Sequence, residues 1–127
     1  MTTPRQSLGA FGEKYAVAHL TRAGYRVVAT NARVGRGEID IVAWDGPTLA
    51  FIEVRTRRGT SFGTPEESIT ARKAERMARL AYQYMEANQL SPTSWRIDVV
   101  AIKVAPSGRV SRISVIKSAV GEGGTTG

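Results

Sequence analysis

The chain contains no cysteine, a single histidine and no long apolar run. Without cysteine there is no disulfide framework and no thiolate metal site, and His19 alone cannot supply an imidazole cluster. No segment approaches the roughly 20 apolar residues that a membrane-spanning helix requires. Residues 1–7 are polar and no apolar signal core follows them, so the sequence predicts no secretory leader. These absences favour a cytoplasmic protein with no membrane partner.

Acidic residues are also scarce, with 11 Asp and Glu against 18 Lys and Arg, a net charge of +7. The excess favours an anionic partner, and nucleic acid, DNA in particular, comes first. Seven of the basic residues lie between Arg55 and Arg79. Charge alone does not separate this reading from that of a well-solvated surface. The sequence leaves a homodimer and a protein partner open.

The length of 127 residues, 42% of them apolar, fits one domain. We expect it to span residues 1–117, followed by a disordered tail over the Gly- and Thr-rich residues 118–127. Periodicity and turn residues predict the elements that follow. They are a helix at 6–23, a strand at 25–33, a loop or tight hairpin at 31–37, two strands within 37–55 and a loop at 56–65. A helix in one or two pieces follows at 66–88, its main piece capped by Thr70, and then a strand at 95–104 and an edge strand at 109–117.

This order predicts an α/β fold, a small mixed sheet of about five strands flanked by helices. The helix between the third and fourth strands allows those two strands to run parallel. The fourth strand, residues 95–104, is apolar on both faces and is therefore expected inside the sheet.

Two carboxylates stand out because they lie within apolar strands. Asp40 is flanked by Ile39 and Ile41, and Glu53 lies in the following strand, across an Asp-Gly-Pro turn. Burying a carboxylate is costly unless it is paired with a cation or binds a metal. Neighbouring strands can bring the two groups together, and oxygen ligands of this kind suit Mg²⁺ or Mn²⁺. Arg55 could then stabilise charge on a phosphate.

Three further residues each have a functional and a structural interpretation. Glu13 is either a third acid or an exposed helical glutamate. Lys73 lies on the apolar stripe of the second long helix, where it is either a site residue or a lysine whose stem packs at the edge of the stripe. Asp98 is the only acid of an apolar strand, and hydrogen bonding or pairing with Arg96 or Lys103 is the favoured role.

Several motifs, in this order, resemble those of the YraN, or UPF0102, family of small bacterial proteins. They are GEIDIVA at 37–43, FIEVRTR at 51–57, GTPEESI at 63–69, RK at 72–73 and IDVVAI at 97–102. The resemblance covers roughly residues 8–117. Through this family the chain is similar to the PD-(D/E)xK nucleases, and to archaeal Holliday junction resolvases among them.

The resemblance implies a restriction-endonuclease-like core and a Mg²⁺- or Mn²⁺-dependent endonuclease that acts on DNA, including branched DNA. Asp40 and Glu53 match the metal-binding acids, Glu13 matches an additional acid of resolvase-like members, and Lys73 matches a helix position near the site. Arg55 stands where the superfamily has its catalytic lysine. The residues expected to contact nucleic acid are Arg36, Arg57, Arg58, Arg72 and Arg76.

Arginine at position 55 defines the alternatives. It keeps the positive charge and can hold a phosphate by two hydrogen bonds, but it cannot release a proton near neutral pH. The first hypothesis is therefore a nuclease, and the second is a catalytically weak or inactive nucleic-acid-binding module on the same fold. In a third, Arg55 and Lys73 neutralise Asp40 and Glu53 in a structural ion-pair core without metal affinity.

Overall fold

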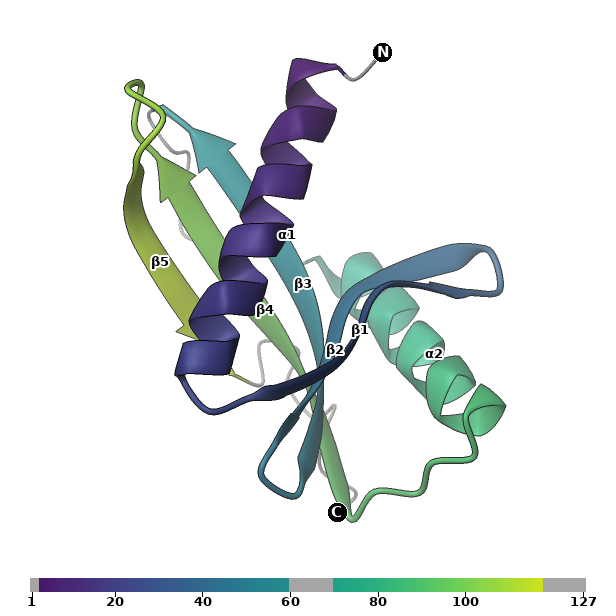
Figure 1. Ribbon diagram of the computed structural model, residues 1–127. Helices are drawn as coiled ribbons and strands as arrows, with labels where there is room; N and C mark the ends of the chain where they lie inside the picture. Colours follow the sequence, from purple (N-terminus) through teal and green to yellow (C-terminus); the bar gives the residue numbers. More distant parts are fainter. Residues whose placement is uncertain (1–2, 60–69, 118–127) are drawn as a thin grey trace.

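The computed structural model describes residues 3–59 and 70–117, which form a five-stranded mixed sheet between two helices (Figure 1). The elements, in chain order, are α1 (Pro4–Arg22), β1 (Arg26–Val34), β2 (Gly37–Asp45), β3 (Thr48–Arg58), α2 (Ala71–Ala87), β4 (Ser94–Val104) and β5 (Val110–Ile116). The predicted α/β class is confirmed. Neither of the described helices is both long and apolar enough to cross a membrane.

The strands lie in the order β1-β2-β3-β4-β5, so chain order and spatial order agree. Only β3 and β4 are parallel, and every other neighbouring pair is antiparallel. The predicted parallel pairing is therefore confirmed, as are the interior position of β4 and the edge position of β5. Helix α2 connects the parallel strands, because such a connection must return along the full length of the sheet.

Each face of the sheet carries its own apolar core beneath one helix (Figure 1). Ala16 and Leu20 of α1 pack over Ile41 and Ile52 on one face. The α2 side has a second cluster, in which the helix contributes Met77, Leu80, Ala81 and Met85. Successive side chains of a strand point to opposite faces, so β3 supplies both cores.

Both helices begin at a threonine whose side chain caps the first turn. The Thr70 hydroxyl accepts a hydrogen bond from the backbone N–H of Lys73 (3.1 Å), as predicted. Thr3 does the same for Gln6, whose side chain accepts the Thr3 backbone N–H in return. This capping box starts α1 at Pro4, two residues before the predicted position. The predicted start of the second helix at 66–69 lies outside the described residues.

The prediction of a loop from residue 56 is wrong for its first three residues, which extend β3 to Arg58. Their sequence is polar, yet Thr56 to Arg58 pair in register with Ile102 to Val104 of β4. Parallel pairing with an apolar interior strand therefore decides the conformation. The remainder of that predicted loop, at 60–65, and the predicted disordered tail at 118–127 lie outside the described residues.

Strand β2 changes partners along its length. Its pairing with β3 runs from Asp45 to Ile41, whereas its pairing with β1 continues to Gly37. The β1–β2 hairpin thus leaves the sheet beyond Ile41 and lies alongside α2 (Figure 1). Strict alternation stops at this point, because Ile39 and Val42 both join the α2-side core. Residues 31–37 form the tight hairpin that was one of the two predicted alternatives.

Candidate functional site

Asp40 lies where β2 separates from β3, one residue beyond their last backbone pair. Its Oδ2 accepts a hydrogen bond from the backbone N–H of Val54, at 2.8 Å. The carboxylate therefore replaces the backbone carbonyl that an adjoining strand would have offered to Val54. This bond fixes the Asp40 side chain against β3 at Val54, the residue that follows Glu53.

The electrostatic surroundings of Asp40 disfavour its charged form. Burial raises its pKa, the Val54 hydrogen bond lowers it, and the negative charges of Glu53, Glu13 and Glu38 raise it further, to about 6 in total. Among the described residues, no lysine or arginine lies within ion-pairing distance of Asp40. The carboxylate is thus held among like charges and lacks a cation from this part of the chain.

Glu53, in contrast, has two cations beside it. Arg55 Nε lies 3.4 Å and Lys73 Nζ 3.7 Å from Glu53 Oε2, and all three side chains are about one-fifth to one-quarter exposed. Arg55 follows by two residues on β3 and so shares the face of Glu53. Lys73 reaches the same oxygen from the first turn of α2. The two cations named in the ion-pair hypothesis thus lie beside Glu53, whereas Asp40 has no ion pair with a described residue.

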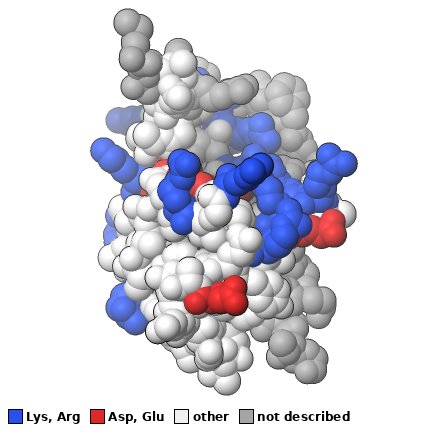
Figure 2. All heavy atoms as spheres, turned by 90° about the vertical axis from the view of Figure 1, so that its right-hand side faces the viewer, with Lys and Arg blue, Asp and Glu red and all other residues white. Residues whose placement is uncertain are grey.

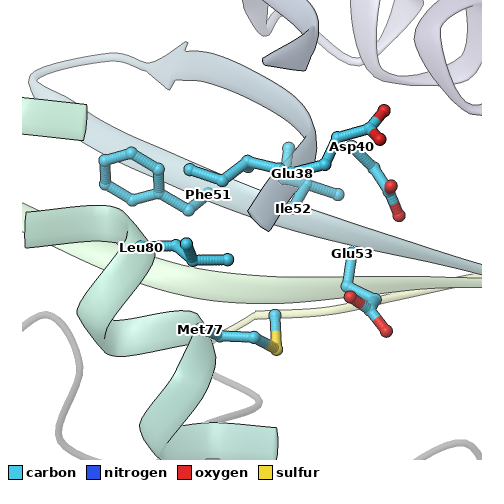
Figure 3. A pocket seen from close by; sticks show the side chains of 8 residues that line it. Glu38, Asp40, Phe51, Ile52, Glu53, Met77 and Leu80 are labelled. Atoms are coloured by element: carbon cyan, nitrogen blue, oxygen red, sulfur yellow. The ribbon is translucent and has the colours of Figure 1, made fainter. Parts of the chain in front are cut away.

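A small pocket connects these groups with the α2-side core (Figure 3). The carboxylates of Glu38, Asp40 and Glu53 lie toward one end of it, while Phe51 and Leu80 form an apolar end. One wall comes from the separating strands and the other from α2. The pocket thus joins the two predicted acids on a single concave surface.

Glu13, the third predicted acid, reaches toward Asp40 from α1. Its charge contributes to the raised pKa of Asp40, and its Oε1 accepts a hydrogen bond from Nδ2 of Asn31 at 2.8 Å. Asn31 has a left-handed backbone with φ 49°, which asparagine tolerates better than most residues. Sequence reasoning did not find Asn31, since only the packing of α1 on β1 makes its position significant.

The donor set fits a hard divalent cation that is held by two carboxylates. Among residues 3–59 and 70–117, no three acid, histidine or cysteine side chains form a complete metal cluster. Mg²⁺ nevertheless binds proteins through one or two carboxylates and completes its shell with waters and substrate phosphates. Asp40 and Glu53 are the two acids that suit this mode. A role for Glu13 as a third ligand stays a prediction.

Basic side chains surround this region on the face where α2 and the β1–β2 hairpin meet (Figure 2). The five arginines predicted to contact nucleic acid are all exposed: Arg36, Arg57, Arg58, Arg72 and Arg76. Arg57 and Arg58 end β3, and Arg36 lies in the hairpin turn. Lysines and arginines form a band across the middle of the face in Figure 2.

Asp98 belongs to a different network, on the α1 side of the sheet. It is fully buried, and Arg96 Nε donates to both of its oxygens at 2.9 and 3.0 Å. Arg96 also donates to the Tyr25 hydroxyl at 2.9 Å and to Asp45, which Lys117 contacts in turn. The predicted pairing with Arg96 is confirmed. The i, i+2 spacing on one strand was the signal for it.

Comparison with known proteins agrees with the motif pattern. Residues 12–102 match the model of the uncharacterised protein family UPF0102. A UPF0102 protein of Symbiobacterium thermophilum is 46% identical over 88% of this chain and 94% of its own length. A relative from Moorella thermoacetica is also 46% identical, over 94% of this chain and 99% of its own. One from Chloroflexus aurantiacus is 44% identical over 96% and 99%.

Proposed function

Because the chain belongs to the uncharacterised family UPF0102, whose name assigns no activity, we propose a function from the site itself. The protein is a metal-dependent endonuclease of the PD-(D/E)xK type that hydrolyses phosphodiester bonds in DNA, including branched DNA. The observation that carries the proposal is Asp40, which the Val54 N–H fixes beside Glu53 among like charges. A partly buried acid whose pKa is raised in this way is characteristic of functional sites.

Asp40 and Glu53 are the residues that would hold Mg²⁺ or Mn²⁺. The negative charge of Glu13 also contributes to the raised pKa of Asp40. Such an ion supplies Lewis-acid chemistry, since it draws charge from phosphate oxygens and activates water for attack on phosphorus. It would also relieve the repulsion that raises the pKa of Asp40. In the ion-pair core hypothesis this repulsion would be absent, because Asp40 would already have a cation.

The two cations beside Glu53 suit the stabilisation of negative charge on the phosphate. Lys73 and Arg55 both lie within 4 Å of Glu53 Oε2, on the α2 side of the sheet. Phosphodiester hydrolysis concentrates negative charge on the phosphate oxygens, and preorganised cations stabilise that charge. Arg55 can offer two parallel N–H donors to a phosphate. Lys73 adds an ammonium group with three N–H donors.

A second candidate function, a nucleic-acid-binding module without turnover, is favoured by the same arginine. Arg55 keeps the charge that binds a phosphate but cannot transfer a proton. If hydrolysis needs a lysine amine at this position, the chain retains binding and loses cleavage. The Arg55→Lys variant separates the two candidates, because it restores the amine and leaves the carboxylates unchanged.

The test is a cleavage assay with Mg²⁺ and with Mn²⁺ on a four-way junction and on flapped, single-stranded and duplex DNA. We expect the parent chain to cut, and Asp40→Asn to lose at least about 100-fold in rate, since it removes a ligand charge. Equal cutting by Asp40→Asn after rigorous purification would refute the assignment. Cutting by Arg55→Lys but not by the parent would establish the binding module instead.

A further inference from the structure

The solvent-facing side of α2 carries a line of three arginines that ends in a glutamine. Arg72, Arg76, Arg79 and Gln83 follow one another at spacings of four, three and four, which places them on a single stripe of a helix. All four are exposed, whereas Met77, Leu80, Ala81 and Met85 face the sheet. At 1.5 Å per residue the stripe is about 16 Å long. These four residues are called the α2 stripe below.

The stripe begins at the candidate site. Arg72 precedes Lys73, whose Nζ lies 3.7 Å from Glu53 Oε2. A strand of nucleic acid that follows the stripe from its far end therefore arrives at the two carboxylates. This placement distinguishes the stripe from the basic residues at the opposite edge of the sheet, such as Arg109 and Arg112 next to and within β5.

The other end of the stripe meets the turn of the β1–β2 hairpin. A Cβ atom on Gly35 would lie 3.3 Å from Gln83 Oε1, and one on Gly37 would lie 2.7 Å from Leu80. Only glycine allows the hairpin to approach the helix so closely. Arg36 in the turn and Arg33 just before it are both exposed, and they add positive charge beside the Gln83 end of the stripe.

The charge of the stripe is not balanced within the described residues. None of its three arginines has an acid within 4 Å in this part of the chain, although Glu75 lies on the same helix. Like charges three and four residues apart repel one another along a helix. A polyanion laid along the stripe would reverse that repulsion.

The stripe offers contacts to a backbone and not to bases. Proteins that bind single strands stack the bases on aromatic side chains beside a basic groove. No member of the stripe is aromatic, and the exposed Tyr82 packs edge-on against Trp95, with ring centroids 5.1 Å apart. Arginines without stacking partners position a duplex through its phosphates.

We infer that the α2 stripe binds consecutive phosphates of one strand of duplex DNA and leads that strand to Asp40 and Glu53, with the hairpin turn contacting the duplex beyond. The inference rests on the proposed function for the direction of the path. It concerns binding, however, so it is measured without cleavage. The slope of log K against log salt concentration is negative, and each phosphate contact that is lost reduces its magnitude by about 0.9 for a duplex.

The experiment measures affinity for a fluorescent duplex of about 25 base pairs, and for one of its strands, by anisotropy in EDTA across a range of salt concentrations. The test variant is Arg72→Gln/Arg76→Gln/Arg79→Gln. The control, Arg22→Gln/Arg109→Gln/Arg112→Gln, removes the same charge elsewhere from exposed positions. Glutamine keeps a good helix propensity, and circular dichroism verifies that α2 remains folded.

We expect the stripe variant to lower the magnitude of the duplex salt slope by about 2.7, from three contacts at 0.9 each. The control should change it by less than one contact. Equal slopes for the two triple variants would overturn the inference, as would a parent chain that binds the single strand more tightly than the duplex. A smaller salt slope in the stripe variant, together with no cleavage by the parent chain in Mg²⁺, would refute the nuclease and support duplex binding by the stripe. Cleavage that depends on Asp40, with a salt slope that the stripe variant leaves unchanged, would support the nuclease and refute binding along the stripe.

Discussion

At the scale of single residues, Asp40 carries most of the functional argument. It is an acid in an apolar strand, the N–H of Val54 holds it at 2.8 Å, and neighbouring carboxylates help to raise its pKa to about 6. A group with these properties is poorly suited to a metal-free interior. The charged Asp40 carboxylate should therefore lower the unfolding free energy by a measurable amount.

The raised pKa of Asp40 predicts how the unfolding free energy depends on pH in metal-free buffer. The pKa of Asp40 is about 6 in the folded chain and near the ordinary value of 3.8 in the unfolded chain. Between these two values the folded state binds the extra proton, so the contribution of Asp40 to stability falls as pH rises from about 4 to 6 and is constant above that. Asp40→Asn should remove the loss and raise the unfolding free energy by about 1–3 kcal/mol at pH 7.5.

Denaturant titrations at pH 4 and pH 7.5 check this prediction. The gain from Asp40→Asn should appear at pH 7.5 and largely disappear at pH 4, where the parent carboxyl is protonated in the folded state and partly protonated in the unfolded state. Glu75→Gln, an exposed acid on α2, is the control and should change little at either pH. A destabilised Asp40→Asn at pH 7.5 would mean that the charged carboxylate is satisfied inside the protein.

At the scale of elements, two glycines bring secondary structures close enough to build the site. Gly37 admits Leu80 of α2 against the hairpin, and Gly12 admits the side chain of Thr56, so that α1 lies directly on β3. Glu13 follows Gly12 and owes its position to that contact. The approach of α1 thus determines how strongly its acid acts on Asp40.

A pair of glycines on the same helix tests this packing. A Cβ atom at Gly12 would overlap the Thr56 hydroxyl, whereas one at Gly9 would meet nothing within 4 Å. Gly12→Ala should therefore destabilise the fold by about 1–3 kcal/mol through overpacking. Gly9→Ala should stabilise it by about 0.5–1 kcal/mol, because alanine is the better helix former. Thermal unfolding of both variants decides, and a Gly12→Ala variant as stable as Gly9→Ala would contradict the close contact.

At the scale of the whole molecule, the Arg96 network fastens the sheet at a distance from the candidate site. Arg96 on β4 links buried Asp98 to Tyr25 before β1 and to Asp45 at the end of β2, and Lys117 after β5 reaches Asp45 at 3.0 Å. The hydrogen bond from Arg96 holds the pKa of Asp45 below its usual value. Segments far apart in the chain are therefore joined by charge as well as by apolar packing.

Substitutions in this network should lower the stability of the fold and leave metal binding unchanged. Asp98→Asn leaves Arg96 with a weakened partner in a buried place and should cost about 3–5 kcal/mol of unfolding free energy. Asp45→Asn, at the partly exposed rim of the network, should cost less. Neither should change divalent-metal affinity at temperatures where the chain is folded. Chemical denaturation and a manganese titration measure the two properties, and a loss of metal affinity in folded Asp98→Asn would return Asp98 to the site.

The sequence predicted the α/β class, the order of helices and strands along the chain and the parallel pair, because local periodicity and connection length constrain these features. It also placed Asp40 and Glu53 on adjoining strands, since only a short turn separates them. It did not foresee that β3 continues to Arg58, because pairing with the distant β4 overrides the polar sequence there. The contact between Asn31 and Glu13 was equally inaccessible, because it depends on how α1 packs on β1.

Calorimetric titration of Mn²⁺ into the parent chain and into Asp40→Asn, near pH 7.5, tests the central claim most directly. Asp40 has no lysine or arginine within ion-pairing distance among the described residues and is the proposed ligand, so its replacement should weaken metal binding by about tenfold to a hundredfold. We expect one site in the parent, that loss in Asp40→Asn, and no change in Glu75→Gln. Absence of binding in the parent, or equal affinity in all three chains, would contradict it.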